Sequence, residues 1–133
     1  EDAQAGRCYL PKIWLAEAGI DPDDMMNPDH RDALIALINR LCDLAGEYEQ
    51  SARSGAANLP FRSRWAVLAA AGIYGDIARA IKKSDGASLE QRIYTSKFKK
   101  LGWIVKAFGQ ALFKSTRRDR EALWTRERAI RLA

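Results

Sequence analysis

The sequence is poor in the side chains from which most metal and redox sites are built. Among 133 residues it has one histidine, His30, and two cysteines, Cys8 and Cys42, which lack metal-ligand spacing. Neither a zinc site nor a disulfide framework is therefore expected, and the cysteines are predicted to be reduced, half-buried thiols of a cytoplasmic protein. No apolar run approaches the roughly 20 residues of a membrane span, and no charged-then-apolar signal sequence is recognised.

Alternation of apolar and polar residues, the pattern of a half-buried strand, is also missing. Apolar residues recur instead at steps of three and four, as at Leu34, Leu37 and Leu41, which is the spacing of one helix face. Clusters of proline, glycine and aspartate separate these segments, and Ser88 with Gln91 predicts a capping box. The sequence therefore predicts an all-α fold in one domain. The expected helices cover residues 11–19, 29–54, 60–83, 96–114 and 118–132.

Acidic side chains are scarce in the second half of the chain, where the basic ones gather. The formal net charge is +5 and the sequence pI is about 9.4. Nucleic acid, an anionic membrane surface and a phosphorylated substrate are the partners that such a charge favours, while a solvated helix face is the simplest interpretation of any single basic run. These basic residues include Lys97, Lys99, Lys100, Lys106, Lys114, Arg117, Arg118, Arg120, Arg126, Arg128 and Arg131.

One segment, 66–73 with the sequence AVLAAAGI, has no polar side chain on any face. A helix that is apolar all round is expected in the middle of a bundle. Tyr74 follows directly, and Asp76, Arg79, Lys82 and Lys83 come next, which suggests an apolar cavity with an anion-binding mouth. The tryptophans Trp14, Trp65 and Trp103 are interpreted as packing residues.

Three blocks of the sequence resemble one family, the squalene and phytoene synthases that join two prenyl chains head to head. The opening EDAQAGRCYLPKIWLAEAGI resembles the end of the family's second aspartate-rich motif and the R-x-Y-x-P segment that follows it. LPFRSRWAVLAAAGIYGDI resembles the buried helix that carries a substrate-contacting tyrosine. RIYTSKFKKLGWIVKAFGQAL resembles the next segment, most closely in bacterial phytoene synthases.

The resemblance implies a fold and a chemistry. The fold is an isoprenoid-synthase-type helical bundle, of which residues 1–133 would form the C-terminal part, without the N-terminal part that bears the first aspartate-rich motif. The chain opens on Glu1 and Asp2 with no initiator methionine, which agrees with that expectation. Ionising an allylic diphosphate needs Mg²⁺ and cationic donors around the leaving group. The resulting carbocation needs a dry, apolar tunnel.

The resemblance also implies roles for individual residues. Asp2 matches the last aspartate of the second motif and would be a catalytic Mg²⁺ ligand. Tyr74 matches a catalytic tyrosine that reaches the substrate diphosphate, and Arg92 matches an arginine that binds the same group. Arg7 and Tyr9 lie just past the motif and would support it, and Arg7 is also a candidate for binding the diphosphate. Without the resemblance, Asp2 is an ordinary helix carboxylate, Tyr74 a core tyrosine and Arg92 a surface arginine.

The implied function is Mg²⁺-dependent condensation of two geranylgeranyl diphosphates to phytoene in carotenoid biosynthesis. A squalene or dehydrosqualene synthase acting on farnesyl diphosphate is an alternative, and so is a family member that has lost catalysis and serves as a binding or assembly protein. A nucleic-acid-binding helical protein fits the charge but not the apolar segment at 66–73, so no nucleic-acid partner is expected. With one metal-binding aspartate, this chain by itself is expected to be inactive.

The expected partners are a prenyl diphosphate substrate, the missing N-terminal half of the same protein and, through Lys97, Lys99 and Lys100, an anionic membrane. The membrane is the second interpretation of this lysine cluster, after a solvated face. The expected location is the cytoplasm, with peripheral contact to the inner membrane face.

Overall fold

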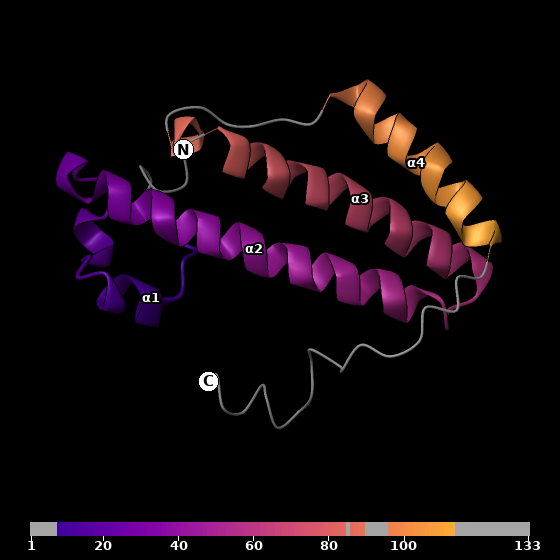
Figure 1. Ribbon diagram of the computed structural model, residues 1–133, viewed down its shortest axis with the longest axis horizontal. Helices are drawn as coiled ribbons and strands as arrows, with labels where there is room; N and C mark the ends of the chain where they lie inside the picture. Colours follow the sequence, from indigo (N-terminus) through magenta and orange to yellow (C-terminus); the bar gives the residue numbers. More distant parts are fainter. Residues whose placement is uncertain (1–7, 85, 90–95, 114–133) are drawn as a thin grey trace. The chain divides into compact units, whose positions relative to one another are not determined.

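The computed structural model describes residues 8–84, 86–89 and 96–113, and every element within these ranges is a helix. The all-α prediction is thereby confirmed. Four of the five expected helices are present, and the fifth, at 118–132, lies outside the described residues. The elements are α1 (Lys12–Glu17), the short 3-10 helices η1 (Pro22–Asp24) and η2 (Pro28–His30), α2 (Arg31–Ala56), α3 (Phe61–Lys83), the 3-10 helix η3 (Ala87–Leu89) and α4 (Lys97–Leu112) (Figure 1).

The helix boundaries follow from capping side chains and from one glycine. Asp21 and Asn27 accept backbone N–H bonds at the starts of η1 and η2, each followed by a proline. Gly19 ends α1 with a φ of 68°, a conformation that costs glycine little. Ser96 caps α4 by accepting the Lys99 N–H at 3.3 Å.

The capping box expected at Ser88 and Gln91 does not begin at Ser88. This residue lies inside η3, and its own N–H donates to the Ser84 hydroxyl at 3.3 Å. Ser84, directly after α3, thus takes the capping position, and its hydroxyl also donates to the Ile81 carbonyl at 2.7 Å. Gln91 lies outside the described residues.

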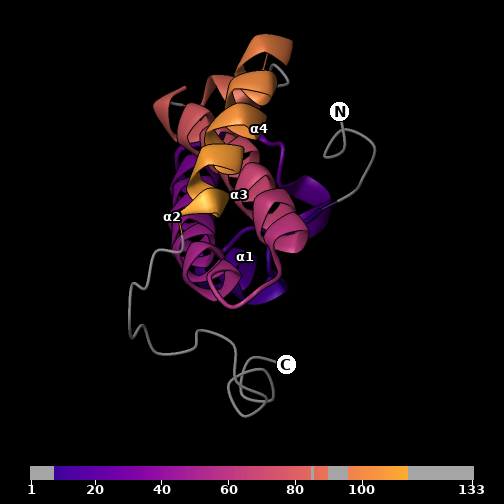
Figure 2. The same ribbon diagram turned by 90° about the vertical axis from the view of Figure 1, so that its right-hand side faces the viewer.

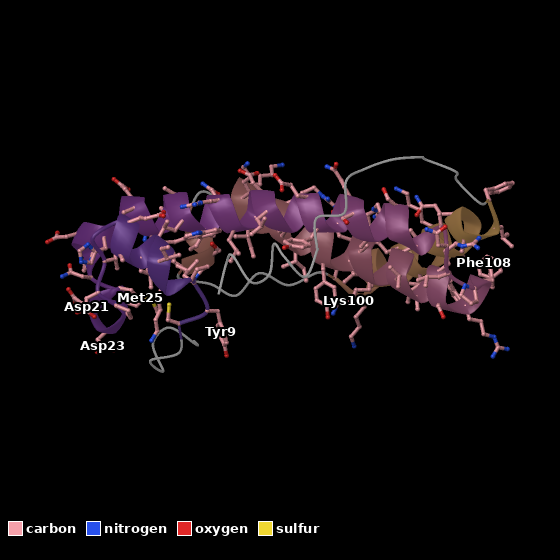
Figure 3. All side chains as sticks on the ribbon, turned by 90° about the horizontal axis from the view of Figure 1, so that it is seen from below. Tyr9, Asp21, Asp23, Met25, Lys100 and Phe108 are labelled. Atoms are coloured by element: carbon pink, nitrogen blue, oxygen red, sulfur yellow. The ribbon has the colours of Figure 1, made fainter. Side chains whose placement is uncertain are left out.

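The chain divides into two compact units, which we describe separately. Unit 1 comprises Glu1–Ala45 and Ile77–Tyr94. Its core consists of Leu15, Ile20, Met25 and Leu37, packed by residues that include Cys8 and Trp14. Figure 3 labels Met25 together with Asp21 and Asp23, which belong to the segment between α1 and α2.

A salt bridge and a cation–π contact fix α1 on the first half of α2. Arg40 on α2 donates to the Glu17 carboxylate at 2.8 Å, and its guanidinium lies 4.1 Å from the Trp14 ring centroid. Both Arg40 and Glu17 are about half exposed, so water screens the ion pair and its share of the stability is below about 1 kcal/mol. The apolar core of unit 1 therefore contributes most of its stability.

Unit 2 comprises Gly46–Asp76 and Thr95–Ala133. Its core is made of Ala56, Leu68, Ala107 and Ala111, and the two alanines of α4 allow that helix to approach α3 closely. Both views show α4 alongside α3 (Figures 1 and 2). The aromatic rings at the same contact are edge-on to one another: Phe108 lies 5.5 Å from Phe61 and 5.3 Å from Trp65.

Two side chains of α3 bond directly to the backbone of α4. The Trp65 indole N–H donates to the Ile104 carbonyl at 2.9 Å. Arg64 donates to the Ala111 carbonyl at 2.9 Å and, with its other terminal nitrogen, to the Leu59 carbonyl at 2.9 Å. Arg64 therefore ties the end of α4 to the connection between α2 and α3, and provides a donor for the Ala111 carbonyl in the last turn of α4.

The expectation that 66–73 is buried all round is wrong for the described chain. Leu68 and Gly72 are buried, whereas Ala66 and Ala70 are exposed. Within unit 2 this helix meets α2 and α4 on two sides, and the remaining face carries small side chains. Exposing such small side chains to water costs little free energy. No helix in the described ranges is both long and apolar enough to span a bilayer.

Two glycines of unit 2 are expected to change the stability of the fold in opposite directions when each is replaced by alanine. A Cβ at Gly72 would lie 2.1 Å from the Trp103 ring, whereas one at Gly102 would meet nothing within 4 Å. We expect Gly72→Ala to destabilise the fold by about 1–3 kcal/mol, because the tryptophan ring has to move. Gly102→Ala should instead stabilise it by about 0.5–1 kcal/mol through helix propensity. Urea unfolding followed by circular dichroism measures both, and equal effects of the two substitutions would contradict this packing.

Candidate functional site

Tyr74, the predicted substrate-binding tyrosine, lies on α3 with 71% of its surface exposed. Gly72 and Asp76, two residues away on either side, both meet α4. The helical repeat therefore places Tyr74 on the opposite side of α3. The alternative of a buried core tyrosine is wrong in the described structure, because the side chain stands clear of both helix contacts of unit 2. A phenol in this position is accessible to a ligand.

The other three predicted site residues, Asp2, Arg7 and Arg92, lie outside the described residues. Their roles stay predictions. The described residues contain no group of three or more histidine, cysteine, aspartate or glutamate side chains that could hold a metal ion. The single Mg²⁺ ligand implied by the sequence, Asp2, is not among them.

The basic residues expected at the mouth of a cavity are in part engaged with carboxylates of the same chain. In unit 1, Lys82 donates to the Asp43 carboxylate at 2.5 Å. Cys42 lies beside this pair. Burial raises the pKa of the Cys42 thiol, the charge of Asp43 raises it further, and Lys82 lowers it by a smaller amount. The thiol is thus held in its protonated, less reactive form at neutral pH.

Trp103 connects α4 to the segment of α3 that carries Tyr74. Its indole N–H donates to the Asp76 carboxylate at 2.5 Å, and its ring lies directly against Gly72. Two cations flank the ring: the Lys106 ammonium lies 4.5 Å and the Arg53 guanidinium 5.4 Å from a ring centroid of Trp103. A hydrogen bond to a carboxylate and a close ring-to-backbone contact together fix the crossing of α3 and α4.

Glu49 on α2 holds the same segment of α3 from another side. Its carboxylate lies so close to Gly75 that a Cβ there would be 1.9 Å from a Glu49 oxygen. Arg53 donates to Glu49 through two nitrogens, at 2.8 and 3.0 Å, and also to Gln110 on α4 at 3.4 Å. The Glu49 side chain is only 12% exposed, so this ion pair is shielded from water.

These contacts define a clamp, formed by Glu49, Arg53 and Trp103, on residues 72–76. Gly72 and Gly75, three residues apart, are the positions where the clamp touches the backbone of α3. Tyr74 lies between them and remains exposed. The clamp therefore positions a phenol without covering it.

Sequence reasoning identified Tyr74 but missed the residues that hold it. Trp103 was interpreted as a packing residue, which is confirmed, yet its bond to Asp76 was not foreseen. The pair Gly72 and Gly75 is the signal that could have indicated a close helix crossing. Nothing in the sequence indicates that Glu49 is one partner in that crossing. Its position along the chain does not show which residues of α3 it contacts.

A protein-family model described as Squalene/phytoene synthase matches residues 1–99. The chain is 42% identical over 112 residues to a 15-cis-phytoene synthase of Enterobacter agglomerans, covering 84% of the chain and 38% of that protein. It is 39% identical over 132 residues to a 15-cis-phytoene synthase of a Paracoccus species, covering 95% and 41%. The chloroplastic phytoene synthase of Narcissus pseudonarcissus is 34% identical over 112 residues, covering 84% and 26%.

The chain thus spans about two fifths of the length of the bacterial relatives it matches. No solved structure gives a significant match. The matched region contains all four residues for which a role was predicted, and it ends shortly after the start of α4.

The bond between Trp103 and Asp76 is testable by a double-mutant cycle. We expect Trp103→Phe, which keeps a ring but removes the N–H, to lower the free energy of unfolding by about 1–3 kcal/mol. Combined with Asp76→Asn, it should show a coupling energy of about 1 kcal/mol or more, measured by urea denaturation. Trp65→Phe is the matched control, because the Trp65 indole bonds to Ile104 and should not couple with Asp76→Asn. Equal coupling in both cycles would contradict the bond.

Proposed function

Because the chain belongs to the squalene/phytoene synthase family, we propose that the whole protein joins two geranylgeranyl diphosphates head to head into phytoene, a step of carotenoid biosynthesis. The observation that carries this proposal is the sequence identity to proteins named phytoene synthase, from bacteria and from plants, over most of the chain. Those names favour phytoene over squalene as the product.

Tyr74 is the residue through which the described structure supports the proposal. Contacts on two other sides of the helix hold the backbone on either side of Tyr74, and its exposed phenol can donate a hydrogen bond to a diphosphate oxygen from that position. Arg92 and Arg7 would add charge-assisted bonds, since the planar guanidinium fork matches phosphate oxygens. These three residues would bind and orient the leaving diphosphate.

We propose Mg²⁺ as the cofactor, with Asp2 as the ligand that this chain contributes. When bound, the ion would supply positive charge that offsets the charge developing on the leaving diphosphate. The family resemblance of the Glu1–Asp2 segment supports this assignment.

We also propose that the protein acts in the cytoplasm, in peripheral contact with the inner face of the membrane. Prenyl diphosphates and their condensation products carry long apolar chains, which partition into bilayers. A peripheral contact agrees with the absence of a membrane-spanning helix from the described part of the chain.

Tyr74 and Arg92 are expected to act on substrate affinity. In the whole protein, Tyr74→Phe and Arg92→Ala should each lower kcat/KM for geranylgeranyl diphosphate about tenfold or more, because each removes a hydrogen bond to a charged group. Steady-state phytoene formation measures the effect. Tyr48→Phe is the control, since Tyr48 is also an exposed tyrosine but lies on α2. Unchanged kinetics of the Tyr74 and Arg92 variants would refute their assignment.

Asp2 is expected to be required for metal-dependent turnover. Asp2→Ala in the whole protein should lower kcat at low Mg²⁺ by about a hundredfold or more, because a lost ligand weakens both metal binding and leaving-group stabilisation. Titrating Mg²⁺ should show partial recovery at high concentration. Asp32→Ala, an exposed carboxylate in the first turn of α2, should keep the wild-type Mg²⁺ dependence. A full rate with Asp2→Ala would show that Asp2 is not a ligand.

A further inference from the structure

The outward face of α4 carries a continuous row of large apolar side chains. Phe98, Leu101, Val105 and Leu112, here called the outer stripe, are 87%, 58%, 66% and 58% exposed. Their spacing of three, four and seven residues places them on one side of the helix. Phe108, which is 42% exposed, lies within the same row.

The opposite side of α4 already has its packing partner. Ala107 and Ala111 are fully buried in the core of unit 2, and the Trp65 and Arg64 side chains of α3 bond to the α4 backbone. Helix α4 is thus attached to unit 2 by its buried alanines, by Trp103 lying against Gly72 and by the edge contacts of Phe108, and the four residues of the outer stripe face away from Trp103. Within a water-facing helix this arrangement is unfavourable, because each exposed ring or branched chain could gain free energy by leaving water.

All charged side chains of α4 are lysines: Lys97, Lys99, Lys100 and Lys106. By the helical repeat, Lys97 lies beside the outer stripe, whereas Lys99, Lys100 and Lys106 lie roughly 120–140° from its centre, Lys100 on the side of the buried alanines. Figure 3 labels Lys100 and Phe108, a lysine and an apolar residue of this helix. Long lysine side chains at such positions can keep their ammonium groups in a polar layer while the helix body lies in an apolar one.

The positive charge is specific to unit 2. Its described residues include seven lysines and arginines but only three carboxylates, Glu47, Glu49 and Asp76. Of these, Glu49 bonds to Arg53 and Asp76 to Trp103. The described residues of unit 1 carry six cationic and seven acidic side chains. The exposed apolar row and the excess charge therefore occur on the same unit.

We propose that α4 is an interfacial helix that lies in the surface of an anionic lipid bilayer, with the outer stripe among the acyl chains and its lysines at the lipid phosphates. An anionic bilayer is the partner that offers an apolar layer and a negative layer side by side, matching both features of the helix. This inference rests on the membrane contact proposed above and names the element that makes it.

A second copy of the chain and nucleic acid each match only one of the two features. A second copy of α4 placed on the outer stripe would bring two sets of lysines together, and their repulsion would oppose the contact. Nucleic acid would meet the lysines but would leave the apolar row in water. The lipid surface is therefore the occupant that the charges and the exposed side chains favour together.

The proposal is tested by measuring how much of the purified protein binds to lipid vesicles in the absence of substrate. With mixed phosphatidylglycerol and phosphatidylcholine vesicles at low salt, we expect sedimentation of the protein with the vesicles, and weaker binding as salt is added. Phe98→Ser with Val105→Ser should lower the partition coefficient about tenfold or more, because two side chains would no longer leave water. Ile13→Ser is the control, since Ile13 on α1 is 66% exposed, as is Val105.

A second pair of variants tests the charge. Lys97→Glu with Lys99→Glu should weaken binding to the anionic vesicles about tenfold or more and leave the weak binding to pure phosphatidylcholine unchanged. Lys12→Glu with Lys83→Glu makes the same charge change on unit 1 and should have a much smaller effect. Circular dichroism verifies that each variant is folded.

Three results would overturn the proposal. They are no binding to anionic vesicles, equal binding by the outer-stripe variant and the wild type, and a dimer in solution that the outer-stripe variant converts to a monomer. Phytoene formation from substrate dispersed in detergent is measured separately. An unsubstituted protein that forms phytoene but does not bind anionic vesicles would refute the role of α4 alone, whereas one that binds the vesicles but forms no phytoene would refute the proposed enzymatic function.

Discussion

The contact of Trp103 with Gly72 and Asp76 is the interaction on which unit 2 depends. A tryptophan ring lying directly on a glycine brings two helix backbones closer than any larger residue would allow. The indole bond to Asp76 fixes the position of α4 along α3 as well as its distance. The buried alanines at 107 and 111 can pack on α3 only because this crossing is so close. Tyr74 is exposed for the same reason, since the clamp occupies the other sides of its helix.

The positions of the helices could be predicted from the sequence because they depend on local chemistry. The period of three and four in α2, the turn residues near Asp21 and Asn27, and Ser96 ahead of α4 each act over a few residues. The number of partners around 66–73 could not be predicted in this way. An apolar segment indicates what can be buried, while the surfaces that bury it are supplied by distant parts of a polypeptide.

In the candidate site, too, the contacts between distant parts of the chain could not be predicted from the sequence. Tyr74 was found through its family context and not through any local pattern, and the sequence gives no indication that Glu49 would reach Gly75. Contacts between distant residues are set by tertiary packing, which a single sequence does not encode position by position. The sequence places most of the outer stripe of α4 on one helix face, but it does not indicate whether that face is buried. Its exposure became apparent only when Ala107 and Ala111 proved to be the buried side.

Arg64 has a consequence for how unit 2 opens. One guanidinium bonds to the Leu59 carbonyl before α3 and to the Ala111 carbonyl at the end of α4. Neither terminus can fray alone without leaving part of that half-buried cation unsatisfied. Opening at the two places is therefore coupled, although 52 residues separate Leu59 from Ala111 in the chain. In hydrogen exchange, the amides of both termini would behave as a single foldon, with one shared opening free energy and not two independent ones.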